Sequence, residues 1–296
     1  SLALGLATII GVPAAQAEGV LKIGRHQDST TLDPIMTIQN ADIWVMNNMN
    51  ALLVRVNRDA TDVEPDLAES WEISEEDGLT YTFHLRDGLK CGDGSPLKAS
   101  DAKFSLERLR DTEGSIMAGM FSVMKSVEAP DDRTVVITLN QPSAPFLAAM
   151  AMFAAAILPE AAVTAAGDGF GNAPVGAGAF VLDEWKRGEY LRLKKNPHYW
   201  DAERVQLDGV EWVYVPNDNT RILKLQAGEV DAVVFVPFNR VAELEADENI
   251  NIHLDPSSRE DHMLINHEHE PLGDVRVRRA LYHALDRQAI VDAVTF

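Results

Sequence analysis

Cysteine is almost absent from this sequence of 296 residues, which contains only Cys91. A single cysteine cannot form an internal disulfide, so the fold must be held together by its hydrophobic core. Cys91 lies between a strand pattern and a turn, with no histidine near it in the sequence. This setting favours a buried small apolar residue over a reactive thiol.

Basic residues are also scarce. Lys and Arg number 26 against 46 Asp and Glu, which gives a formal net charge of -20. Such a charge repels nucleic acids and anionic membranes unless a local basic patch overrides it. The densest basic run, Arg276 with Arg278 and Arg279, lies in a helical pattern beside Asp274 and Asp286. This pattern indicates a solvated helix face, so no nucleic-acid partner is predicted.

Long apolar runs are lacking too, because no segment after the N-terminal one reaches the roughly 18 apolar residues of a membrane span. The apolar residues 2–12 are too few to cross a bilayer, and residues 15–17, Ala-Gln-Ala, form the small-x-small pattern of a signal-peptidase site. We predict a signal peptide over residues 1–17, cleavage before Glu18 and a periplasmic protein. An N-terminal membrane anchor is the alternative. Residues 144–158, interrupted by Pro145, are predicted to form a core helix.

The composition is that of a globular protein, with 46% hydrophobic and 24% charged residues. In the first half, alternation predicts a strand at residues 20–24 and a helix-like pattern covers residues 41–53. Two hairpins are predicted at residues 71–85 and 127–139, the first turning at Asp77-Gly78. A helix between them should begin near Ser100 or Asp101, whose side chains can cap it.

The Gly-rich residues 167–178 mark a boundary that we expect to exclude regular secondary structure. Beyond it the pattern alternates between strands and helices, which is typical of a mixed α/β fold. The expected strands are residues 179–185, 190–194, 210–215, 230–235 and 261–266. The expected helices are residues 219–227 and a long one at 274–296, with Asp274 as its N-cap.

No common catalytic motif is present. The sequence contains no Gly-x-Ser-x-Gly, no Gly-Lys-Ser/Thr phosphate loop, no Gly-x-Gly-x-x-Gly after a strand and no His-Glu-x-x-His. A catalytic pair cannot be selected from 46 acidic residues by sequence alone. We therefore predict that the protein is not an enzyme, and we expect no cofactor.

Histidines gather at positions 253, 262, 267 and 269, with glutamates interleaved at 268 and 270. In a strand, His267 and His269 would share one face, and imidazole with carboxylate suits zinc, nickel or copper. The neighbouring Gly, Pro and acidic residues favour a solvated loop between a strand and a helix. No metal site is predicted, and His267 and His269 remain weak candidates.

Several motifs together carry a resemblance to a known family. Those that agree in order are residues 67–71 (Leu-Ala-Glu-Ser-Trp), 78–88 (Gly-Leu-Thr-Tyr-Thr-Phe-His-Leu-Arg-Asp-Gly), 93–97 (Asp-Gly-Ser-Pro-Leu), Asp101, 104–108 (Phe-Ser-Leu-Glu-Arg), 174–180 (Pro-Val-Gly-Ala-Gly-Ala-Phe), 184–185 (Glu-Trp), 196–197 (Asn-Pro), 199–200 (Tyr-Trp), 274–281 (Asp-Val-Arg-Val-Arg-Arg-Ala-Leu) and 286–287 (Asp-Arg). The chain resembles the first half or more of the extracytoplasmic solute-binding proteins of ABC importers, family 5, which include peptide binders. It departs from their pattern at Cys91, Gly92, Ala177 and Ala179.

The resemblance implies an α/β fold of the type II periplasmic binding protein kind, peptide-binding subclass, with mixed sheets and most of the C-terminal lobe missing. Residues 18–59 and 171–268 would form domain I. Residues 60–170 would be an inserted domain II, and residues 269–296 the start of a truncated domain III. The strand at residues 20–24 should then share a sheet with strands of the 179–266 region, and the two hairpins should belong elsewhere.

The resemblance also implies a function. The protein would be the solute-binding component of an ABC importer, capturing an extended small solute, a di- or oligopeptide, for the permease membrane subunits and their ATPases. It would act as a monomer when full length. A nickel or other metal chelate, an opine or an oligosaccharide is the alternative solute on the same scaffold.

The candidate ligand-binding residues follow from the same resemblance. A polar turn faces the family's cleft, part of one helix approaches it, and a small residue lies at the crossover between domains. These residues are Ser29, Thr30, Thr31, Asn40, Trp44, Asn47, Asn48 and Ala177. Each of these three groups also has a purely structural interpretation. The polar turn can be a capped turn, the helix residues a buried helix face, and the crossover residue a tight bend.

Overall fold

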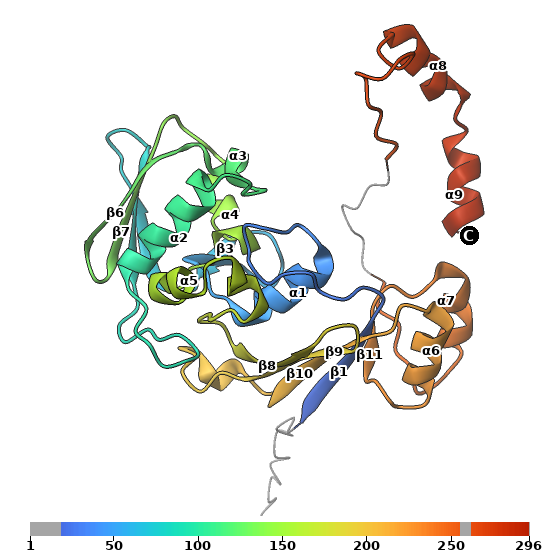
Figure 1. The fold of residues 1–296 in the computed structure, drawn as a ribbon, viewed down its shortest axis with the longest axis horizontal. Helices are drawn as coiled ribbons and strands as arrows, with labels where there is room; N and C mark the ends of the chain where they lie inside the picture. Colours follow the sequence, from blue (N-terminus) through green and yellow to red (C-terminus); the bar gives the residue numbers. More distant parts are fainter. Residues whose placement is uncertain (1–18, 255–261, 296) are drawn as a thin grey trace, which may run out of the picture.

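The computed structural model of the chain describes residues 19–254 and 262–295 (Figure 1). The predicted signal peptide with its cleavage site, and residue 261 of the last predicted strand, lie outside the described residues. The described part is a mixed α/β fold with a five-stranded, a four-stranded and a two-stranded sheet. The predicted mixture of sheets and helices is confirmed.

The five-stranded sheet has the order β11-β1-β10-β9-β8. Its strands are β1 (Val20–Arg25), β8 (Phe180–Lys186), β9 (Tyr190–Lys195), β10 (Gly209–Tyr214) and β11 (Ala232–Val233). β1 runs parallel to β10 and β11, whereas β9 is antiparallel to both β8 and β10. The strand predicted at residues 20–24 therefore pairs with strands more than a hundred residues later in the chain, as predicted.

Helix α1 (Asn40–Met49) packs on the five-stranded sheet. Its buried Val45 and Met46 share a core cluster with Leu191 and Leu193 of β9 and with Trp212 of β10. Alternate residues of β9 are buried because successive side chains of a strand point to opposite faces. Helix α6 (Asp218–Gln226) lies beside β1 and β11.

The four-stranded antiparallel sheet has the order β4-β5-β7-β6 and contains both predicted hairpins. Its strands are β4 (Ala68–Ile73), β5 (Thr80–Leu85), β6 (Met124–Asp131) and β7 (Thr134–Leu139). The first hairpin turns at Gly78, whose φ of +64° is a conformation that glycine adopts without steric cost. No strand of this sheet pairs with β1, so the two hairpins lie in a separate sheet as predicted.

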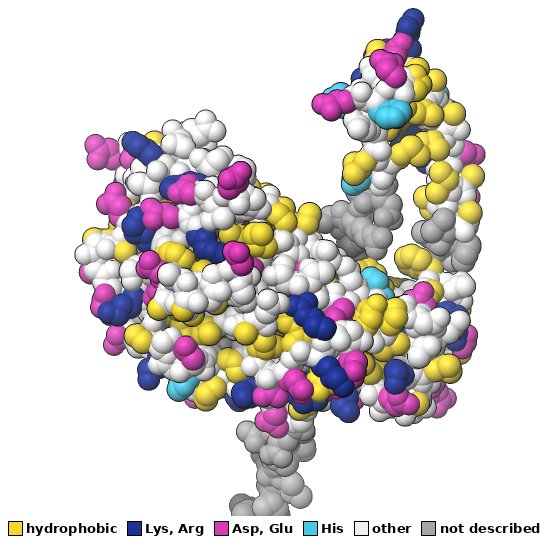
Figure 2. Space-filling view, viewed as in Figure 1, with side chains coloured by type: hydrophobic (Ala, Val, Ile, Leu, Met, Phe, Trp, Pro, Cys, Tyr) yellow, Lys and Arg dark blue, Asp and Glu magenta, His cyan; other side chains and the backbone are white. Residues whose placement is uncertain are grey.

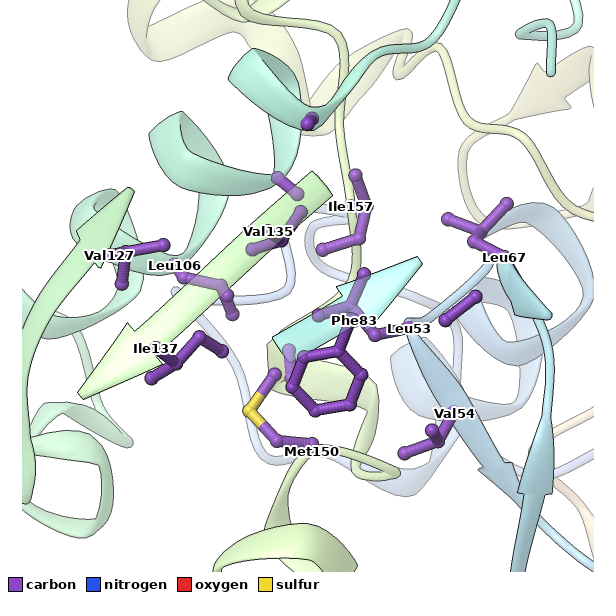
Figure 3. Packing of buried hydrophobic residues seen from close by; sticks show 14 of the residues in the cluster. Leu53, Val54, Leu67, Phe83, Leu106, Val127, Val135, Ile137, Met150 and Ile157 are labelled. Atoms are coloured by element: carbon purple, nitrogen blue, oxygen red, sulfur yellow. The ribbon is translucent and has the colours of Figure 1, made fainter. Parts of the chain in front are cut away.

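Helix α2 (Ala99–Asp111) covers the four-stranded sheet and begins where capping chemistry predicts. The Asp101 carboxylate accepts hydrogen bonds from the backbone N–H of Lys98 at 2.8 Å and of Glu160 at 3.0 Å. Leu106 of the helix packs with Phe83 and Val135 of the sheet in the core shown in Figure 3. All three side chains are completely buried.

The helix expected at residues 41–53 is shorter than predicted, because α1 ends at Met49. Asn50 is extended, Ala51 forms an antiparallel bridge with Ile157, and β2 (Val54–Val56) pairs with β3 (Val63–Pro65). Pairing with distant backbone thus overrides the local helical pattern. The core helix predicted at residues 144–158 is wrong for the same reason. The chain there forms α4 (Phe146–Ala149) and a 3-10 turn η1 (Phe153–Ala155) before it reaches the bridge.

The Gly-rich segment is also more regular than predicted. After α5 (Glu160–Ala166), residues 167–172 form a 3-10 helix, η2 (Gly167–Asn172), so the expectation that the segment excludes regular structure is wrong for its first half. Residues 173–178 do lack regular structure. The division of the chain into domains at residues 59/60, 170/171 and 268/269 stays a prediction.

The C-terminal third departs most from the predicted elements. The strand expected at residues 230–235 reduces to the two residues of β11, and residues 262–266 form no strand. Instead of one helix at 274–296, α8 (Val275–Ala284) and α9 (Arg287–Thr295) follow each other. Asp274 caps α8 as predicted, and Asp286 starts a new helix by accepting the N–H of Ala289 at 3.0 Å. The remaining short elements are α3 (Ala118–Phe121), η3 (Ala202–Arg204) and α7 (Phe238–Glu245).

Candidate functional site

A cavity of about 640 Å³ lies where the three parallel strands of the five-stranded sheet end. β1, β10 and β11 run in the same direction, so the residues that come after them meet at one edge of the sheet. His26 follows β1, Pro216 follows β10 and Phe235 follows β11, and all three line the cavity. Open α/β sheets bind their ligands outside the carboxyl ends of parallel strands, so this edge is the candidate site.

A larger cavity of about 1070 Å³ adjoins the first. It is lined by the segment around β11 and by residues of the 247–254 stretch. The two cavities share Trp44, Phe235, Val236 and Phe238, so they are neighbouring parts of one hollow. In the space-filling view, apolar side chains reach the surface over the region of α6 and α7, which borders this hollow (Figure 2). The site is therefore long and largely apolar.

Four rings contact one another in a row that we call the aromatic wall: His26, Phe235, Trp44 and Trp212. The first three line the cavities, and the buried Trp212 lies behind Trp44. The ring centroids of Trp44 and Trp212 are 6.1 Å apart with an interplanar angle of 18°, which is a stacked arrangement. Phe235 lies 5.7 Å from Trp44, and His26 meets Phe235 edge-on at 4.9 Å. Such ring faces bind planar or apolar groups by stacking.

A buried arginine lies behind the aromatic wall. Arg25, the last residue of β1, is completely buried, and its guanidinium carbon is 5.6 Å from the Trp212 ring centroid. Its Nη1 donates to the backbone carbonyl of Ala41 at 2.6 Å. Burial lowers the pKa of Arg25 to about 10, because desolvation penalises the charged form, and the carboxylates of Asp28 and Asp42 oppose this effect. Arg25 thus joins β1 to the first turn of α1.

The polar turn predicted to face the ligand has its hydroxyl groups occupied within the fold. The buried Ser29 hydroxyl donates to the carbonyl of Ala41 at 3.0 Å. The Thr30 N–H and hydroxyl donate to the two oxygens of the buried Asp42 carboxylate at 2.8 and 2.9 Å. The Thr31 hydroxyl accepts the N–H of Asp33 at 3.2 Å. None of the three threonine and serine residues lines the two cavities described above.

The candidates on α1 divide between different places. Asn40 and Trp44 line the smaller cavity, and Trp44 lines the larger one as well. Asn47 lines a separate cavity of about 330 Å³. The Asn48 side-chain nitrogen donates to the carbonyl of Trp44 at 2.7 Å, within the helix. Ala177 is only 2% exposed and belongs to the hydrophobic core. The structure therefore brings only Asn40 and Trp44 together at the sheet edge.

The separate cavity contains a buried carboxylate, Asp66, which is 5% exposed. It accepts the backbone N–H of Leu52 at 2.8 Å and the indole N–H of Trp200 at 3.1 Å. Burial raises the pKa of Asp66, while these hydrogen bonds and the guanidinium groups of Arg55 and Arg86 oppose the rise. Arg86 lies over the Trp200 ring, 3.8 Å from its centroid. This arrangement ties the loop after β9 to the segment before β2.

The candidate metal ligands His267 and His269 lie in an exposed turn before α8. Across residues 19–254 and 262–295, no three side chains of His, Cys, Asp or Glu come close enough together to hold a metal ion. His253 lies apart from them and lines the larger cavity. Among the helices of these same residues, none is long and apolar enough to cross a bilayer.

The sequence analysis did not predict His26, Phe235 or two buried arginines, Arg25 and the cavity-lining Arg221, as part of the site. Arg25 and His26 come directly after the strand predicted at residues 20–24, and Phe235 closes an apolar run. Only the meeting of three parallel strands brings these residues together with Trp44. No local motif marks them.

Solved structures share this architecture. The periplasmic binding protein DppA from Helicobacter pylori, in complex with the peptide STSA, superposes with a TM-score of 0.82 at 31% sequence identity, covering 94% of this chain and 58% of that one. Among curated proteins, the probable D,D-dipeptide-binding periplasmic protein DdpA of Escherichia coli K12 is 35% identical over 99% of this chain and 58% of its own length. The glutathione-binding protein GsiB of Escherichia coli O1:K1 is 32% identical over 98% of this chain and 56% of its own length.

The fold and the long hollow at the sheet edge define a protein of the type II periplasmic binding class. Residues 62–296 match the bacterial extracellular solute-binding proteins, family 5. The chain belongs to this family, which confirms the resemblance read from its motifs. It spans little more than half the length of the curated relatives it matches.

Proposed function

We propose that this chain is part of the solute-binding component of an ABC importer that captures a di- or oligopeptide. The observation that carries this proposal is the pair of adjoining cavities along the aromatic wall, because their volumes of about 1070 and 640 Å³ leave room for a solute of several residues. The relatives support it, since DppA was solved with a peptide and DdpA and GsiB are named for dipeptide and glutathione binding.

The polar groups of the smaller cavity suit a peptide backbone. Gln27, Gln39 and Asn40 line it with side-chain amides, which both donate and accept hydrogen bonds as peptide groups do. The one carboxylate in its lining, Asp218, is paired with Arg221 at 2.6 Å. At this end of the site, the solute therefore meets uncharged side-chain amides and a carboxylate whose charge is neutralised by an arginine. We assign Asn40 and Trp44 to solute contact.

Two of the other candidates, Ser29 and Thr30, have a supporting role in this proposal. Ser29 and Thr30 hold the start of α1 through Ala41 and Asp42. Because α1 carries Trp44, these bonds orient one side of the site.

Calorimetry with the full-length protein and the peptide Ser-Thr-Ser-Ala tests this function. Peptide binding is expected, and Trp44→Leu should weaken it about tenfold, because lost ring stacking and apolar contact amount to about 1.4 kcal/mol. Trp71→Leu is the matched control, since Trp71 is also half-buried but lies in β4, away from both cavities. Absence of binding by a panel of di- to tetrapeptides, with binding of an opine or a nickel chelate, would refute the peptide assignment.

The same proposal includes two further points. The full-length protein acts as a monomer, and it delivers the solute to the permease membrane subunits and their ATPases. We place the mature protein in the periplasm, after cleavage before Glu18. DdpA, a relative that covers most of this chain, is named as a periplasmic protein. N-terminal sequencing of the exported protein should begin at Glu18, and a mature protein that keeps residues 1–17 would contradict the assignment.

A further inference from the structure

Phe235 has an unusual backbone conformation at the centre of the site. Its φ of +58° lies in the left-handed region, which bulky side chains rarely adopt. In the described parts of the chain, Ala60 is the other non-glycine residue with a positive φ, and it lies in the turn between β2 and β3. Strain of this kind persists only where the surrounding structure imposes it, and it gathers at ligand sites.

Arg221 of α6, which is 1% exposed, lies against the backbone of Phe235. Its Nη2 donates to the backbone carbonyl of Phe235 at 2.9 Å and to Asp218 at 2.6 Å. Its Nη1 donates to the carbonyl of Val215 at 2.9 Å. The rigid guanidinium therefore joins the residues that come after β10 and β11 in one fixed geometry.

The strained conformation determines where the Phe235 ring lies. In a strand that continued beyond β11, side chains would alternate between the two faces of the sheet. Instead, the ring turns into the aromatic wall, where it contacts Trp44 and His26. Phe235 is 42% exposed, so part of the ring remains open to a solute. Because Trp44 and Phe235 line both cavities, an extended solute that occupies both must pass over this pair.

The surroundings of the pair favour an uncharged planar group. Asp218 is neutralised by Arg221, and burial together with the charge of Arg221 lowers the pKa of His26, so that its imidazole is neutral at neutral pH. At the boundary of the two cavities, the solute therefore meets the rings of Trp44 and Phe235. Stacking against them rewards an aromatic side chain more than a small aliphatic one.

We propose that Phe235 is a specificity-determining residue, held in place by Arg221 as its positioning residue, and that the site selects peptides bearing an aromatic side chain. This inference rests on the proposed peptide-binding function and adds the class of peptide. It concerns the pair formed by Phe235 and Trp44 at the boundary of the two cavities.

The test compares two probes, Ala-Phe-Ala and Ala-Ala-Ala, by calorimetry on the full-length protein. The ratio of their dissociation constants is the aromatic preference. The native protein should show a preference of about tenfold, from stacking of about 1.5 kcal/mol. Phe235→Gly accepts the positive φ but lacks the ring, so its preference should fall close to one while its affinity for Ala-Ala-Ala changes little. Ala60→Gly is the matched control, because it alters the other positive-φ residue, which lines neither cavity, and should leave the preference unchanged.

The role of Arg221 is tested by a double-mutant cycle. Arg221→Met should reduce the aromatic preference in the native background and leave it unchanged in the Phe235→Gly background, because its effect acts through the ring. Arg221→Lys is the second variant if Arg221→Met does not fold. Lysine keeps the charge but cannot reproduce the fixed fork of three hydrogen bonds, so it should also lower the preference.

Each outcome separates the two proposals. Equal binding of both probes by the native protein would overturn the selectivity for aromatic peptides and leave peptide binding intact. A preference that survives Phe235→Gly would overturn the role of Phe235. Additive effects of the two substitutions would overturn the role of Arg221. Absence of binding with either probe and with Ser-Thr-Ser-Ala would overturn the proposed peptide-binding function itself, and the selectivity with it.

Discussion

Replacing Gly178 by alanine should destabilise the protein strongly, because this glycine lies against the backbone at the end of α1. A Cβ atom at position 178 would come within 2.4 Å of the carbonyl carbon of Met49 and 2.7 Å of the nitrogen of Asn50. The Gly178 N–H also donates to the carbonyl of Met49 at 2.8 Å. The atoms that would be hit belong to the main chain and cannot rotate away as a side chain can, so the two segments must separate.

The expected cost comes from two effects. Overpacking in a closely packed core costs about 1–3 kcal/mol, and weakening the hydrogen bond between Gly178 and Met49 adds about 1 kcal/mol. Gly178→Ala should therefore lower the free energy of unfolding by about 2–4 kcal/mol. Because α1 carries Trp44, the same displacement should also weaken solute binding.

Gly169→Ala is the matched control within the same Gly-rich segment. A Cβ at position 169 meets no atom within 4 Å, and the residue has no positive φ. Alanine there should be neutral or stabilise the protein by about 0.4–1 kcal/mol, because it restricts the unfolded chain. Urea unfolding followed by far-ultraviolet circular dichroism measures both variants. Equal unfolding midpoints for Gly178→Ala and Gly169→Ala would refute the close-contact argument.

Three further predictions concern two buried ionisable groups. Burial raises the pKa of the Cys91 thiol to about 12, so alkylation by iodoacetamide at neutral pH should be slow in the native protein and fast in concentrated urea, and rapid native labelling would contradict its burial. Asp66→Ala should destabilise the protein by about 2–4 kcal/mol, because it leaves the N–H of Leu52 and the indole N–H of Trp200 without their acceptor. Burial raises the pKa of Asp66 in the folded protein, so its contribution to the free energy of unfolding is present below the unfolded pKa and is lost as pH rises through the folded pKa. Asp66→Asn should lack this contribution to the pH dependence. If the native protein and Asp66→Asn showed the same change in unfolding free energy between acid and neutral pH, the shift would be contradicted.

The hairpins of the four-stranded sheet were predictable from the sequence because their determinants are local. Asp77-Gly78 supplies a turn with a positive φ, and the strands on each side alternate apolar and polar residues. The start of α2 was predictable for the same reason, since the capping carboxylate of Asp101 lies within the first turn of the helix. The family was also evident from the order of its motifs.

Tertiary contacts decided where the elements end. The helical pattern of residues 41–53 gives no sign that α1 stops at Met49. The stop depends on Gly178 and on the bridge between Ala51 and Ile157, which are far away in the sequence. Likewise, the apolar run at residues 230–235 yields only the two-residue strand β11, and the Phe235 carbonyl beyond it accepts a hydrogen bond from Arg221 of α6. Local propensity is a weak preference that such long-range contacts override.

The candidate site shows the same division. The sequence determined that a polar turn and a helix bearing Trp44 come after the first strand, and that the chain has the motifs of a solute-binding family. Only the tertiary structure decided that the hydroxyls of Ser29 and Thr30 serve the fold, while Trp44 stacks on the buried Trp212 and meets Phe235 beside the cavities. The reason is physical: a residue's type fixes which contacts it can make, but parallel strands that are distant in the sequence determine which partners it meets.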